Sequence, residues 1–302
     1  MTGRFIASVQ LPSGAIPWEP SRELDPWNHV EAAMGLDVAG LHDEAAAAYD
    51  WLARNQNPDG SWYAAYRDNQ PTDTSCDSNF TAYVAVGVRH HQLSAGADVE
   101  RLVPMVAGAV DFVLARQRPG GEIGWRANDD GALLTGNCSI HHALRCAADL
   151  GILRAGAMAR LRAAIREERA FTVKPHSMDW YYPVLTGVLE EPQALQRLRS
   201  RWHDFVVPGL GVRCVDDQPW VTGGETAELA LALAVRGQRE AAQQLLTDIQ
   251  RLRHHDGSYW TGYQFENDVL WPDERTTWTA GAVLLASAAI AGEPATLATF
   301  SP

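Results

Sequence analysis

The sequence has 302 residues, of which 46% are hydrophobic, and this composition excludes an intrinsically disordered chain. Its 37 acidic residues outnumber the 25 lysines and arginines, and the net charge of -12 argues against a nucleic-acid partner or an anionic membrane surface. We find no signal peptide and no apolar run long enough for a membrane span, and the four scattered cysteines suggest reduced thiols, so we expect a cytoplasmic protein.

The predicted elements repeat one arrangement along the chain. An apolar helical run ends in glutamine, a polar turn containing glycine follows, and a tryptophan closes the turn. The arrangement occurs at residues 10–18, 56–62, 117–125 and 250–260, and the long interval before the last copy leaves room for two degenerate ones. Six two-helix units predict an array in which each unit buries the apolar face of the next.

Two kinds of helix alternate between these turns. Helices with one charged side and one apolar side are typical of a solvent-facing layer, and we predict them over 43–56, 98–117, 156–168 and 239–253. Helices that are apolar nearly all round should be buried. We predict these inner helices over 27–41, 79–93, 139–150, 178–189, 225–235 and 275–291.

The pattern predicts an all-α fold, an (α/α)6 toroid of six inner and six outer helices that forms a single domain over residues 1–302. Residues 206–215 contain a proline and two glycines and are expected to form a loop or short hairpin at the mouth of the ring. The sixth inner helix should pair with the N-terminal segment, which would place the termini close together. The last ten or so residues are expected to form a flexible tail.

Polar and aromatic residues begin each inner helix, so that parallel inner helices would gather them at one mouth of the ring. Carboxylates beside flat aromatic faces suit a neutral polyhydroxy ligand, because the rings cover its C–H faces and the carboxylates accept its hydroxyl protons. The expected substrate-binding residues are Asp25, Trp27, His29, Glu31, Asn79, His141, His142, Trp180, Tyr181, Tyr182, Trp220 and Trp278. We expect no metal and no cofactor.

Four carboxylates are the catalytic candidates: Asp179, Glu274, Glu225 and Asp77. Asp179 stands in the aromatic string MDWYYPVL, which favours the protonated form that a general acid needs. Glu274 would activate water from the opposite side of the ring, with Glu225 as its rival. Carboxylates about 6.5 to 9.5 Å apart would give an inverting glycosidase. A structural interpretation stays open, in which Asp25, Asp77 and Glu274 cap helices.

The turns at 56–62 and 250–260 resemble the QW repeats of squalene-hopene cyclases, and the ring resembles the α/α toroid of terpenoid cyclases and protein prenyltransferase β subunits. This resemblance implies the fold. The DxDD string with which class II cyclases protonate their substrate is absent from the sequence, and so are the zinc-binding strings of the prenyltransferases.

A second resemblance points to carbohydrate chemistry. Residues 25–36 are similar to inner helices of glucoamylase-like (α/α)6 glycosidases, and residues 273–285 resemble the region near the catalytic base of those enzymes. We therefore expect a glycoside hydrolase, most simply an inverting one acting on a small or soluble glycan. The alternatives are a terpene cyclase or prenyltransferase-like enzyme, a sugar epimerase that uses His141 and another histidine as acid and base, or a glycan-binding ring without activity.

Overall fold

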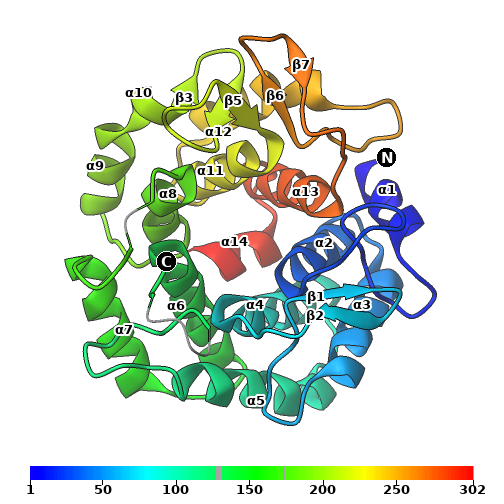
Figure 1. The fold of residues 1–302 in the computed structure, drawn as a ribbon, viewed down its shortest axis with the longest axis vertical. Coiled ribbons are helices and arrows are strands. Elements are labelled where there is room, and N and C mark those ends of the chain that lie inside the picture. The colour runs from blue at the N-terminus through cyan, green and yellow to red at the C-terminus, as the bar shows by residue number, and fades with distance from the viewer. Residues whose placement is uncertain (127–130, 173, 302) are drawn as a thin grey trace.

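Six helices form a closed ring in the computed structural model, which describes residues 1–126, 131–172 and 174–301. Each of these inner helices contacts the next, and the last contacts the first (Figure 1). In order around the ring they are α2 (Pro26–Val38), α4 (Ser78–Ala95), α6 (Leu134–Asp149), α8 (Ser177–Leu185), α11 (Gly223–Val235) and α13 (Thr277–Ala291). The predicted inner helices correspond to these six, although α6 begins five residues earlier than predicted.

An outer layer of helices surrounds this ring (Figure 1). Its members are α1 (Thr2–Val9), α3 (His42–Asn55), α5 (Val103–Leu114), α7 (Ala155–Glu167), α9 (Gln193–Ser200) and α12 (Arg239–Asp248). Helix α1 packs against α13, as the sequence predicts for the N-terminal segment and the sixth inner helix. The short α10 (Trp202–Phe205), η1 (Glu100–Leu102) and η2 (Ile249–Leu252) complete the outer connections.

The repeated glutamines hold successive outer helices together. Gln56 Nε2 donates to Gly60 O of its own turn at 2.9 Å and to Met105 O of α5 at 2.8 Å. Gln10 and Gln117 make the same pair of bonds, each to its own turn and to the following outer helix. Gly60 has a φ of +90°, and a Cβ there would lie 2.2 Å from Gly108 O, so the turn requires glycine. These turns are therefore structural.

The prediction of an all-α fold with loops or short hairpins at the mouth is confirmed only in part, because the rim of the described structure carries two small antiparallel sheets. The strands β1 (Ala65–Arg67) and β2 (Gln70–Asp73) form a hairpin. A five-stranded sheet has the order β3 (Val206–Val207), β4 (Gly211–Arg213), β5 (Trp220–Thr222), β6 (Gly262–Gln264) and β7 (Val269–Leu270). Strands of two to four residues are too short to show a period-two pattern in the sequence. The hairpin expected within residues 206–215 is present as β3 and β4.

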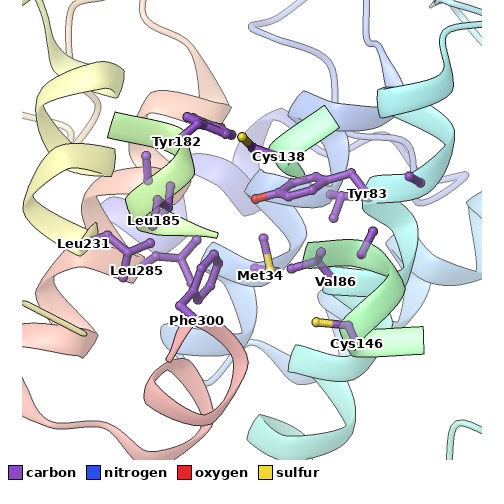
Figure 2. Packing of buried hydrophobic residues seen from close by; sticks show 14 of the residues in the cluster. Met34, Tyr83, Val86, Cys138, Cys146, Tyr182, Leu185, Leu231, Leu285 and Phe300 are labelled. Carbon is purple, nitrogen blue, oxygen red and sulfur yellow. The ribbon is translucent and has the colours of Figure 1, made fainter. Parts of the chain in front are cut away.

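The C-terminal residues fold back into the ring as helix α14 (Pro294–Phe300), which contacts α4, α11 and α13 (Figure 1). Phe300 is 2% exposed, and Figure 2 shows it among Met34, Leu231 and Leu285 in the apolar interior. The expectation of a flexible tail is therefore wrong, because this segment buries its apolar side chains. The predicted proximity of the two ends is also not seen in the described residues, because the N-terminus lies at the outer edge whereas α14, which ends at Phe300, lies inside the ring (Figure 1).

Among the described residues, no single helix is both long and apolar enough to cross a membrane, whereas α13 and α14 together pass that test by length and composition with a bend of 105° between them.

Candidate active site

The N-terminal ends of the inner helices are joined at one end of the ring. In four of them an N–H of the first residue donates to the segment that precedes a neighbouring inner helix. These bonds are Ser78 N to Trp125 O (3.0 Å), Ser177 N to Cys214 O (2.9 Å), Gly223 N to Thr261 O (2.9 Å) and Thr277 N to Trp18 O (2.7 Å). We call this end the mouth. The polar residues that begin the inner helices gather there.

One cavity of about 210 Å³, here called the inner pocket, opens between α2, α4, α6 and α8. It brings together four of the residues expected at the site, namely Trp27, Asp77, Asn79 and Asp179. The remaining lining residues are Phe80, Trp125, Arg126, Leu133, Thr135, Gly136, Lys174, His176 and Met178. Asn79 is 4% exposed, and its Oδ1 accepts no hydrogen bond from the described residues.

A second cavity of about 310 Å³, the outer pocket, adjoins the first between α8 and α9. Its lining residues are Leu134, Glu168, Phe171, Thr172, Lys174, Asp179, Trp180, Arg197, Ser200 and Arg201. Lys174 and Asp179 line both pockets. These two side chains therefore lie where the two pockets adjoin.

Asp179 is fixed from two sides. Its Oδ1 accepts hydrogen bonds from the backbone N–H of Thr135 at 3.1 Å and from the Thr135 hydroxyl at 2.5 Å. Arg197 of α9 donates to the carbonyl oxygens of Asp179 (2.8 Å) and Trp180 (2.7 Å), which holds the first turn of α8. The second carboxylate oxygen, Oδ2, accepts no hydrogen bond from the described residues and can act on a ligand.

Asp25 and Asp77 are helix N-caps, which is the structural interpretation of these residues. Asp25 accepts from Asn28 N (2.9 Å) and from the indole N–H of Trp18 (2.8 Å), and burial raises its pKa to about 6. Asp77 accepts from two backbone N–H groups of α4 and from the indole N–H of Trp125. Burial also raises the pKa of Asp77, against the opposing effect of these donors.

A buried cluster of carboxyl and phenol groups lies below the inner pocket. Glu31 accepts a hydrogen bond from the Tyr83 hydroxyl at 2.5 Å, and Glu228 accepts from the hydroxyls of Tyr181 and Tyr182. Trp27, which lines the inner pocket, packs its ring 5.5 Å from that of Tyr83 and 5.9 Å from that of Tyr182. Burial raises the pKa of both glutamates, and the phenol hydroxyls that donate to them act in the opposite direction. Glu31, Tyr181 and Tyr182 thus lie under the pocket rather than on its surface.

The other carboxylates proposed for catalysis lie outside the two pockets. Glu225 is 8% exposed in the first turn of α11, where the Trp278 ring covers the neighbouring Gly224. Glu274 lies on the rim before α13 and accepts from the Thr261 hydroxyl at 3.1 Å. Trp220 belongs to the rim sheet, and its indole N–H donates to Trp271 O.

The expectation that three histidines lie in the mouth is wrong. His29 faces the outer layer, where its Nδ1 accepts from Ile16 N and its Nε2 lies 3.0 Å from Ala48 O. Burial lowers its pKa to about 4, so it is a neutral structural residue. His142 lies about two turns along α6 from the mouth, and its Nε2 lies 2.8 Å from Thr299 O of α14. His141, at the preceding position of the same helix, lines a separate cavity beside α7.

Trp180 points outward rather than into the mouth. Its ring stacks on Phe205 at 5.2 Å, and its edge lines the outer pocket. The sequence-based site omits Tyr83, Trp125, Thr135 and Lys174. Thr135 could have been predicted as a site residue, because it is a polar residue in the first turn of an inner helix. Trp125 and Lys174 lie in loops, where the periodicity of the sequence gives no signal.

Among the described residues, His254, His255 and Asp256 form a group whose ligand atoms lie within 4.8 Å of one another. The Arg275 guanidinium lies 2.6 Å from His254 Nδ1 and 2.7 Å from the Asp256 carboxylate, so a positive charge already neutralises this acid. This arrangement disfavours a metal ion.

No known protein-family profile matches the chain. The MMP endo-(1,4)-3-O-methyl-alpha-D-mannosidase of Mycolicibacterium hassiacum is 49% identical to it, in a match that covers 96% of this chain and 85% of that protein. The chain belongs to the family of this mannosidase. It is accordingly a glycoside hydrolase that acts on a glycan. The predicted resemblance to glycosidases is supported, whereas the resemblance to terpenoid cyclases stays a prediction.

Solved structures share the fold of this glycoside hydrolase at low sequence identity. A glycosidase variant in complex with glucose superposes with a TM-score of 0.79 at 16% identity, covering 96% of this chain and 95% of that one. A D-mannose isomerase superposes with a TM-score of 0.71 at 11% identity, with the same coverage. These likenesses concern the fold alone.

The epimerase alternative requires histidines in the mouth, where His141 and His142 do not lie.

Proposed function

We propose that the chain is an endo-acting glycoside hydrolase that cleaves (1,4) bonds between 3-O-methyl-α-D-mannose units in the mouth of an (α/α)6 toroid. The 49% identity to an enzyme of that name supports the substrate. The observation that carries the mechanism is the position of Asp179, which lies where the two pockets meet. A glycosidic oxygen lies between two sugar units, so a proton donor must lie between two sugar-binding pockets.

In this proposal Asp179 is the general acid. Thr135 occupies its Oδ1, and the free Oδ2 delivers a proton to the glycosidic oxygen as the bond breaks. The sugar that is attacked occupies the inner pocket, and the leaving sugar occupies the outer pocket.

The second carboxylate of the inner pocket is Asp77, on the wall formed by α4. Three N–H donors orient it, and they leave one of its roughly four lone-pair sites for a water molecule. We propose that Asp77 activates this water against the anomeric carbon, with inversion of configuration. Glu274 and Glu225, the partners suggested by the sequence, line neither pocket, and they serve as the competing assignments.

The apolar side chains of the inner pocket suit a methylated sugar. Trp27 offers a flat face to the sugar ring, and Phe80, Leu133 and Met178 offer surface to O-methyl groups that cannot donate hydrogen bonds. The unpaired Oδ1 of Asn79 accepts from a free hydroxyl.

The test compares Asp179→Asn and Asp77→Asn with Glu225→Gln and Glu274→Gln on a 3-O-methyl-α-(1,4)-mannose oligosaccharide. Loss of a general acid or base lowers kcat by roughly 10²- to 10⁴-fold. The Asp179→Asn enzyme should still cleave a dinitrophenyl glycoside, because this leaving group needs no proton. Azide should restore the Asp77→Asn enzyme and give a glycosyl azide of inverted configuration. Asparagine also caps helices, so both variants should fold.

The proton NMR spectrum of the first product gives its anomeric configuration. An α-configured product would contradict inversion. A large loss of activity in Glu225→Gln or Glu274→Gln, with Asp77→Asn unaffected, would transfer the role of base to that glutamate. An inactive wild-type enzyme would overturn the proposed substrate.

A further inference from the structure

Lys174 is the only lysine in the sequence, whereas every other basic side chain apart from histidine is arginine. It precedes α8, and in the described part of the chain it shares with Asp179 alone the property of lining both the inner and the outer pocket. The one primary amine carried by a side chain therefore lies beside the proposed proton donor.

Among the described residues, the ammonium group of Lys174 has no hydrogen-bonding or ion-pair partner that would explain its position. Its Nζ lies 5.7 Å from the centre of the Trp125 ring, and no hydrogen bond or ion pair joins it to another residue in the described part of the chain. The other cations of the outer pocket are paired: Arg197 with Glu168, and Arg201 with Asp204 and Asp216. An ammonium group offers three donors, and here all three are available to a ligand.

We propose that Lys174 binds the glycan at the point where it passes from the inner to the outer pocket, donating hydrogen bonds to sugar oxygens on both sides of the scissile bond. This inference rests on the proposed function, because it places the glycosidic oxygen beside Asp179. Lys174 is then a substrate-binding residue, and it takes no proton in the reaction. The ring of Trp125 stabilises the positive charge of this ammonium group through a cation–π interaction.

The first experiment compares Lys174→Met and Lys174→Arg with Arg251→Met. Arg251 is the matched control, because its guanidinium lies 5.0 Å over the Tyr263 ring and lines neither pocket. Lys174→Met should lower kcat/KM on the methylated oligosaccharide about 10- to 100-fold, mainly through KM, and Lys174→Arg should recover part of this loss. Arg251→Met should match the wild type. An unchanged KM in Lys174→Met would overturn the inference.

The second experiment needs binding but no hydrolysis. An amine-acylating reagent is applied to Asp179→Asn protein with and without the same oligosaccharide, and labelling is read by peptide mass spectrometry. The oligosaccharide should slow acylation of Lys174 at least several-fold and leave the exposed α-amino group of Met1 unchanged as the internal control. Equal labelling in both samples would overturn the inference. Protection of Lys174 together with an inactive wild-type enzyme would refute the proposed reaction and leave the binding role standing.

Discussion

The carboxylate of Asp179 accepts two hydrogen bonds from Thr135 of the neighbouring inner helix, one from the hydroxyl at 2.5 Å and one from the backbone N–H at 3.1 Å, both at the same Oδ1. Thr135 lies in the first turn of α6, and Asp179 lies in the first turn of α8. Both bonds reach Oδ1, so they hold this oxygen against α6 and leave Oδ2 without a hydrogen bond from the described residues. The closure of the ring thus orients the proposed acid.

Removal of the Thr135 hydroxyl should disturb this orientation. We expect Thr135→Val to lower kcat about 10-fold with little change in KM, because a poorly aligned donor affects the transition state more than substrate binding. Thr135→Ser keeps the hydroxyl and should retain most of the activity. Steady-state kinetics on the methylated oligosaccharide measure both values. Equal kcat values for the valine and serine variants would show that the hydroxyl does not position Asp179.

The fold could be predicted because its two signals are periodic. The glutamine turns recur, and structure shows why: Gln56 bonds to its own turn and to the next outer helix. The inner helices read as apolar all round because the outer helices cover one side of them and the neighbouring inner helices cover the flanks, while α14 packs inside the ring against α4, α11 and α13. The prediction of a flexible C-terminal tail was wrong because α14 has only seven residues, too few for its sequence to show a helical pattern. Its burial depends on a cavity that only the closed ring creates.

The sequence predicted only those residues of the inner pocket that lie at the beginning of an inner helix. Asp77, Asn79 and Asp179 begin inner helices, and they do meet in one pocket. His29 and His142 also belong to inner helices, but they lie one or more turns further along, where the helix faces decide their neighbours. Which face turns to the ring centre cannot be read from helices that are apolar on all sides.

The burial of helix α14 inside the ring predicts that substitutions in this helix lower the stability of the protein. Phe300 is 2% exposed and lies 5.1 Å from the His142 ring, so Phe300→Ala should lower the free energy of unfolding by about 3 to 5 kcal/mol. Leu153→Ala is the control, because Leu153 is 70% exposed and its loss should change stability by less than about 0.5 kcal/mol. Urea unfolding followed by circular dichroism compares the two. Equal stabilities would mean that α14 is not docked in solution.

Burial of Asp25 predicts a pH dependence of stability with a definite sign. Its pKa is about 6 in the folded protein against an ordinary value of 3.8, so the folded state binds more protons than the unfolded state between these values. Stability should therefore fall as the pH rises through this window. The loss is absent below about pH 4 and complete above about pH 6, where it amounts to about 3 kcal/mol.

Asp25→Asn provides the comparison, because asparagine still accepts the N-cap hydrogen bond and does not titrate. Unfolding free energies of the wild type and the variant, measured between pH 3.5 and pH 7, should diverge in favour of the variant by roughly 2 to 3 kcal/mol as the pH rises. Other groups titrate in both proteins and cancel in the difference. A constant difference across this range would show that Asp25 stays ionised at its ordinary pKa, with the indole of Trp18 and the N–H of Asn28 compensating for its burial.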